Sequence, residues 1–126
     1  MSAPNTAYKL TFEERPGYLY VSVKADTINE EMAHAYLGEI AAKCRELETE
    51  RLMVYRDIPA VLDTTAMYFA ASHVRSVLRG IKTAFVNPYE SNEKMLQFAT
   101  TVGFNFGEDH ELFNDTAKAE SWLLAR

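Results

Sequence analysis

The chain has 126 residues, enough for one domain with a single buried core. Apolar residues make up 48% and charged residues 25%, a mixture typical of a globular domain, which excludes a disordered or collagen-like chain. With 13 basic and 18 acidic side chains, the formal net charge is −5, so we expect neither nucleic acid nor an anionic membrane surface as a partner.

The single cysteine, Cys44, has no internal disulfide partner, which favours the reducing cytoplasm. Residues 1–6 are a polar lead with no signal-peptide pattern, and no apolar run approaches the ~20 residues of a transmembrane segment.

Residues 8–24 predict a β-hairpin. Apolar and polar residues alternate over 8–13 and again over 18–24, as in half-buried strands. Pro16 and Gly17 between them favour a tight turn, so the two strands are expected to pair antiparallel.

Residues 27–47 predict an amphipathic helix of about five turns. Thr27 and Glu30 have the spacing of a capping box at its start. Apolar residues recur along it at intervals of three and four: Ala33, Tyr36, Leu37, Ile40, Ala41, Cys44 and Leu47.

The rest of the chain alternates strands with helices. Expected strands are 51–57 and 81–86, both of the buried interior type, and 110–113, a short edge strand. Expected helices start near Asp63 or Thr64 and end at Gly80, run from Ser91 to Gly103, and follow a cap at Asn114 or Asp115. In the last helix, three residues are expected to face inward: Ala119, Trp122 and Leu123.

The order β-β-α-β-α-β-α-β-α predicts an α/β fold. We expect one domain over 1–126, with a mixed, mostly parallel sheet, an N-terminal hairpin and helices packed on the sheet.

This layout resembles the STAS domains, in particular their SpoIIAA-like (STAS/SEC14-like) branch, which is related to the anti-sigma-factor antagonists. Two short motifs carry the resemblance: Asp63-Thr64-Thr65 at a helix start, and the closing segment from Leu112 to Leu123. The resemblance implies a SpoIIAA-like fold and a regulatory role exercised through protein contacts. In the antagonists, a partner kinase phosphorylates a serine at the position that Thr65 holds here. Threonine thus replaces serine, and Ala66 stands where that family has glycine.

Asp63, Thr64 and Thr65 form a candidate switch or anion site. Short polar side chains at a helix start cap free backbone amides, each contributing about 1 kcal/mol. An exposed hydroxyl at the same place would let the helix dipole stabilise an added phosphate or a bound anion. The two interpretations are compatible.

A second candidate site follows from strand topology. Asp57 ends one interior strand, and Asn87 and Tyr89 follow the next. Because ligand sites of open parallel sheets lie beyond the carboxyl ends of the strands, these three residues are expected on the rim of a ligand or partner site.

A third candidate is an apolar contact surface. Three large apolar residues follow one another in the second helix, more than one buried stripe accommodates. With the loop before it, the predicted surface comprises Ile58, Val61, Leu62, Met67, Tyr68 and Phe69. A loop folded over the helix, a ligand pocket and a dimer interface all fit this pattern.

Signatures of catalysis are weak in this sequence. His34, His73 and His110 lie on different predicted elements without metal-ligand spacing, and Cys44 lies on an apolar helix stripe, so we expect no metal site and no cofactor.

We therefore expect a non-enzymatic regulatory or protein-interaction domain that binds a protein partner or a second copy of itself. The alternative is a carrier or sensor of a small apolar, lipid-like ligand, as the SEC14-like side of the resemblance implies. A small enzyme is the third interpretation, supported only by the polar rim.

Overall fold

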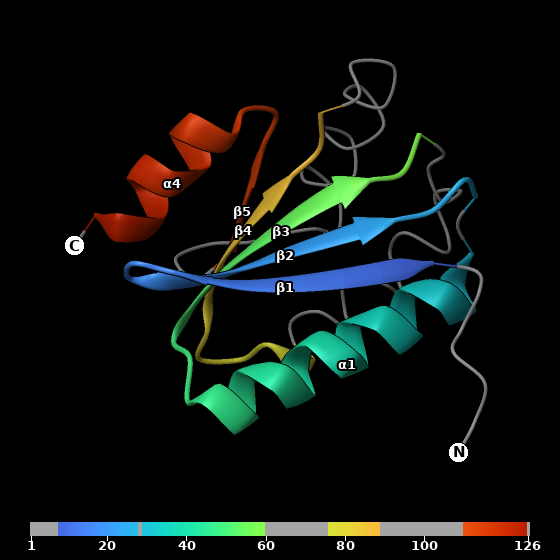
Figure 1. Ribbon diagram of the computed structural model, residues 1–126, viewed down its shortest axis with the longest axis horizontal. Helices are drawn as coiled ribbons and strands as arrows, with labels where there is room; N and C mark the ends of the chain where they lie inside the picture. The colour runs from blue at the N-terminus through green and yellow to red at the C-terminus, as the bar shows by residue number, and fades with distance from the viewer. Residues whose placement is uncertain (1–7, 28, 60–75, 89–109, 126) are drawn as a thin grey trace.

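In the described part of the chain, a five-stranded sheet lies between helices α1 (Glu30–Leu47) and α4 (Thr116–Leu124) (Figure 1). The computed structural model describes residues 8–27, 29–59, 76–88 and 110–125. Along the chain its elements are β1 (Lys9–Arg15), β2 (Tyr18–Lys24), α1 (Glu30–Leu47), β3 (Arg51–Asp57), β4 (Lys82–Val86), β5 (His110–Phe113) and α4 (Thr116–Leu124). The strands lie in chain order, with β1 antiparallel to β2 and every later pair parallel. This confirms the predicted mixed, mostly parallel α/β sheet with an N-terminal hairpin.

The turn between β1 and β2 depends on its two residues, Pro16 and Gly17. Proline presets φ at the first turn position, and Gly17 adopts φ of +88°, which side chains with a Cβ disfavour. Arg15 is in register with Tyr18, so these two residues alone close the hairpin.

The sequence predicts one helix after β3 and another after β4. Most residues of these two predicted helices lie outside the described ranges, in 60–75 and 89–109. Ser76 and Val77 are helical, and Gly80 adopts φ of +83°, in agreement with the predicted helix end at Gly80.

Helix α1 begins later than the capping-box pattern predicted. The cap is Asn29, whose Oδ1 accepts a hydrogen bond from the Met32 amide at 2.8 Å. The prediction of Thr27 was wrong because Asn29 is an equally good cap, and its extended backbone places the carboxamide over the third helical amide. The apolar stripe is confirmed: Ala33, Tyr36, Leu37, Ile40, Ala41 and Cys44 are buried, and Leu47 is partly buried.

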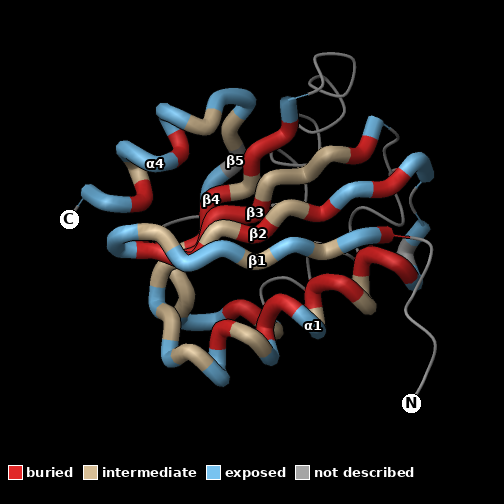
Figure 2. The backbone as a smooth tube through the Cα atoms, in the orientation of Figure 1, coloured by how far each residue is buried: buried red, intermediate tan, exposed pale blue. Residues whose placement is uncertain are grey.

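The sheet separates two apolar clusters, one on each side. In Figure 2, buried stretches lie on the strands and on both α1 and α4. Successive side chains of a strand point to opposite sides, so Leu19, Val21 and Val23 of β2 face α1. Tyr18 and Tyr20 of the same strand belong to the cluster on the α4 side. β3 contributes buried side chains to both clusters, as predicted for an interior strand.

Helix α4 covers only part of its side of the sheet. Asp115 caps it by accepting from the amides of Ala117 and Lys118, and Ala119 and Leu123 are fully buried against β3 and β4. The prediction that Trp122 faces the core was only partly right. It is half-buried at the edge of the cluster, with its ring 5.7 Å from that of Phe113. Within the described residues, no helix is long and apolar enough to cross a membrane.

Candidate functional site

The carboxyl edge of the sheet brings together part of the predicted rim. Asp57 ends β3 and Asn87 directly follows β4, the neighbouring parallel strand, so both lie at this edge. Backbone hydrogen bonds continue past the strand ends, from the Ala25 amide to the Asp57 carbonyl and from the Asn87 amide to the Phe113 carbonyl. The Asn87 side chain is buried rather than open to solvent. Tyr89, the third predicted rim residue, lies outside the described residues.

The predicted apolar contact surface requires a correction at Ile58. This side chain is completely buried and belongs to the core cluster beneath α1, so it adds no exposed apolar surface. The sequence pattern of an apolar run is the same whether its side chains are buried or exposed. The pattern therefore could not show that Ile58 is buried. Several predicted residues lie outside the described ranges, both from this surface and from the switch site: Val61, Leu62, Asp63, Thr64, Thr65, Met67, Tyr68 and Phe69.

Arg56 orders the chain where β3 ends. Its guanidinium donates to the Ile58 carbonyl at 3.0 Å. On the α1 side it approaches the Tyr36 hydroxyl, whose pKa is raised because burial outweighs the opposing effect of this cation. The first loop residue beyond β3 is therefore held in the core by a charged hydrogen bond.

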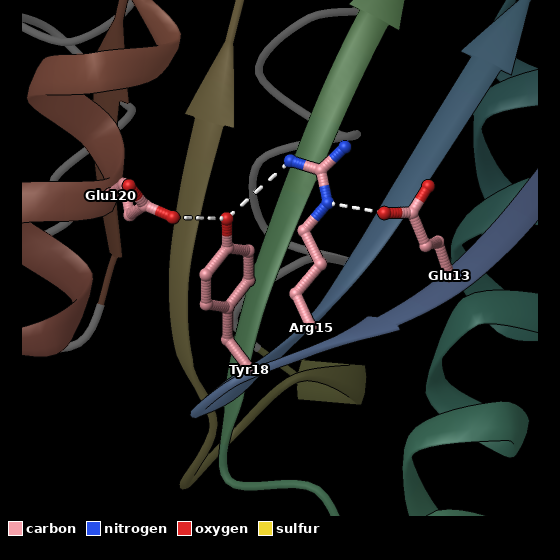
Figure 3. Close-up of polar contacts among 4 residues, drawn as sticks. All are labelled: Glu13, Arg15, Tyr18 and Glu120. Carbon is pink, nitrogen blue, oxygen red and sulfur yellow. Dashed lines mark hydrogen bonds and ion pairs between the residues drawn. The ribbon is translucent and has the colours of Figure 1, made fainter.

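On the opposite side of the sheet, four polar side chains form a continuous chain from β1 to α4 (Figure 3). The Arg15 guanidinium donates to Glu13 at 2.7 Å and reaches the Tyr18 hydroxyl at 3.5 Å. That hydroxyl donates to the Glu120 carboxylate at 2.8 Å. The hydrogen bond to Glu13 is the main reason that the pKa of Arg15 is raised. Burial is the main reason that the pKa of Tyr18 is raised.

Two tyrosines extend this chain across the sheet. The Arg15 guanidinium lies 3.8 Å from the centre of the Tyr20 ring, a cation–π contact. The Tyr20 ring is in turn 6.3 Å from that of Tyr55 on β3. Burial raises the pKa of Tyr20, and no described residue forms a hydrogen bond with either phenol oxygen. Both rings are half-buried, and Arg15 covers one side of the Tyr20 ring.

We call this part of the sheet the open face. α4 packs against β3, β4 and β5, and neither described helix packs extensively over the β1–β2 half of this side. Figure 2 shows β1 along the edge opposite α4. The open face comprises Lys9, Thr11, Glu13, Arg15, Tyr20, Ser22, Lys24 and Tyr55.

The strand register arranges the open face in rows. Lys9 lies opposite Lys24, and Thr11 lies opposite Ser22, which is in turn the neighbour of Tyr55 on β3. The two lysines are exposed, and neither ammonium group forms an ion pair with a described residue. Like charges directly opposite each other across antiparallel strands are destabilising.

Groups suited to covalent or metal chemistry are not gathered in the described part of the chain. Cys44 is buried, and burial raises the pKa of its thiol to about 11, so little reactive thiolate forms near neutral pH. His110 is buried with its Nε2 3.4 Å from the Leu78 carbonyl. The described residues contain no group of three His, Cys, Asp or Glu side chains placed to hold a metal ion.

A shallow pocket of about 400 Å³ opens at the other end of the strands. It lies between the hairpin turn and the loop from α1 to β3. Its walls carry three carboxylates, from Glu14, Glu48 and Glu50, and two guanidinium groups, from Arg15 and Arg51. The mixed charges select no ligand class.

The residues of the open face were missed in the sequence because their meeting is non-local. One signal was available: with Leu19, Val21 and Val23 on the buried side, alternation places Tyr18 and Tyr20 on the other. Which strand and helix would lie beside them could not be read from that pattern.

Comparison with solved structures identifies the fold. The chain is similar to an uncharacterised protein of the DUF3478 family from Shewanella loihica PV-4, described as having a SpoIIAA-like fold. The alignment covers 98% of each chain at 16% identity, with a TM-score of 0.55. No protein-family model matches the sequence, and no curated protein matches it significantly. The chain therefore has a SpoIIAA-like fold, which confirms the fold implied by the resemblance.

Proposed function

We propose that this SpoIIAA-like domain is a non-enzymatic regulatory module that acts through protein contacts, and that the open face is its docking surface. The observation that supports this most directly is the set of ordered aromatic side chains on that face. Tyr20 and Tyr55 lie next to each other, and the Arg15 guanidinium stacks on the first ring. Tyrosine and arginine are enriched at the energetic centres of protein interfaces.

Preorganisation strengthens this interpretation. Immobilising a long side chain on binding costs roughly 0.5–1.5 kcal/mol. Arg15 is already held by Glu13 and Tyr18, and Tyr18 is anchored to α4 through Glu120. A partner would therefore meet a surface whose central side chains have already lost much of their freedom.

Regulation by modification of Thr65 and binding of a small apolar ligand remain further proposals from the sequence, as does a cytoplasmic location. The buried, reduced Cys44 suits a reducing compartment.

Site-specific photo-crosslinking tests the docking surface. Benzoylphenylalanine is placed at Thr11, an exposed position in the middle of β1, in cells that naturally produce the protein. The matched control is Ala42, an exposed position on α1 on the other side of the sheet. We expect a discrete protein adduct from Thr11, identified by peptide mass spectrometry, and none from Ala42.

Two results would count against the proposal. Equal adducts at both positions would show that the face has no preference for a partner. An adduct below about 1 kDa on the Thr11 probe would instead favour the small-ligand alternative.

A further inference from the structure

The geometry points to an acidic protein segment with aromatic or apolar side chains as the partner of the open face. This inference rests on the proposed function and specifies its partner. The inferred partner matches two kinds of side chain on the open face, the paired lysines and the neighbouring tyrosines, and both lie on the same three strands.

The pair formed by Lys9 and Lys24 indicates that the partner is acidic. Lys9 and Lys24 are register partners across β1 and β2, where side chains directly opposite have Cβ atoms about 4.5–5.5 Å apart. The two ammonium groups sit on flexible stems that start from these neighbouring positions, so their like charges disfavour each other in the isolated domain. A carboxylate between them would attract both ammonium groups and offset that repulsion.

The carboxylates of the described residues do not fill this role. Glu13 lies on the same face, but it is bonded to Arg15 at 2.7 Å. Asp57 is the register neighbour of Lys24 on β3, but it already has an interaction of its own. The lysine pair thus remains available to an external anion.

The residues next to the lysine pair indicate which other side chains the partner carries. Thr11 and Ser22 offer hydroxyl donors, and the phenols of Tyr20 and Tyr55 offer two more without described partners. The tyrosine rings add half-buried aromatic area, which favours aromatic or apolar side chains over a purely ionic ligand. The domain as a whole carries a charge of −5, so its overall charge does not attract an acidic partner. The attraction must come from the local positive charge of Lys9 and Lys24, together with the tyrosine contacts.

Fluorescence anisotropy with a labelled random copolymer of glutamate and tyrosine tests the inference directly. At about 50 mM NaCl, where surface charges are weakly screened, we expect saturable binding to the full chain. The double variant Lys9→Glu/Lys24→Glu should bind at least tenfold more weakly. The matched control, Lys43→Glu/Arg45→Glu on α1, makes the same total change in charge on the other side of the sheet and should alter binding less than twofold. Labelled poly-glutamate should bind at least fivefold more weakly than the copolymer.

Several outcomes would overturn the inference. They are no binding of the copolymer, equal binding of poly-glutamate, and equal losses in the Lys43→Glu/Arg45→Glu control. Sedimentation of the protein alone gives a further check, because a dimer abolished by Lys9→Glu/Lys24→Glu would assign the face to a second copy. If the Thr11 probe captures a protein but the copolymer does not bind, only the partner chemistry is wrong and the docking function stands.

Discussion

The hydrogen bond from Tyr18 to Glu120 predicts how firmly α4 is attached to the hairpin. Tyr18 is only 5% exposed, and its hydroxyl donates to the Glu120 carboxylate at 2.8 Å. Tyr18→Phe removes that hydroxyl and keeps the ring. A hydrogen bond to a charged group contributes roughly 1.5–3 kcal/mol, but Glu120 is exposed and regains water, so we expect a loss of about 1 kcal/mol.

That loss is large enough to measure by thermal unfolding. With about 2.1 cal/mol/K of unfolding entropy per residue, a loss of 1 kcal/mol lowers the Tm of a domain this size by about 4 °C. The matched control is Tyr20→Phe, because no described residue bonds the Tyr20 hydroxyl, and it should change stability by less than about 0.5 kcal/mol.

A double-mutant cycle attributes the loss to the contact itself. Tyr18→Phe and Glu120→Ala are measured singly and together by urea unfolding, and the two should couple by about 0.5–1 kcal/mol. Zero coupling, or equal losses for Tyr18→Phe and Tyr20→Phe, would refute this account of how α4 is attached.

Three further predictions test the cap, the thiol and the lysine pair. Asn29→Ala should destabilise the protein by about 1 kcal/mol in urea unfolding and Thr27→Ala hardly at all, and the reverse order would restore the sequence-based cap. Because burial raises the pKa of Cys44 to about 11, the unfolded chain loses its thiol proton first as pH rises from about 9. Stability should therefore fall more steeply between about pH 9 and 11 in the wild type than in Cys44→Ala, where only the buried tyrosines of raised pKa contribute to the fall. Dithiobis(nitrobenzoate) should label the folded protein at pH 8 far more slowly than the urea-unfolded protein. Lys9→Glu should stabilise the domain by about 0.2–1 kcal/mol, since it turns the repulsion with Lys24 into attraction, and unchanged stability would show that the lysines do not interact.

The sequence by itself determined most of the secondary structure, because periodicity and turn chemistry are local. The bounds of β2, β3 and β5 match the predicted ranges, and Pro16-Gly17 closes the hairpin as expected. The start of α1 was misplaced because Thr27 and Asn29 are both good caps, and only the folded backbone shows which side chain reaches a free amide. The ends of the strands could also be predicted from the sequence, and Asp57 and Asn87 lie at the predicted edge of the sheet.

Only the tertiary structure decided which side chains meet. Tyr18 and Glu120 are 102 positions apart, and the contact of Arg15 with Tyr20 depends on the pairing of two strands. Ile58 shows the same limit from the other direction, since its apolar character alone does not distinguish a covered side chain from an exposed one. Burial and contact depend on strand order and on where each helix packs, and these come from the free energy of the whole core rather than from any local pattern.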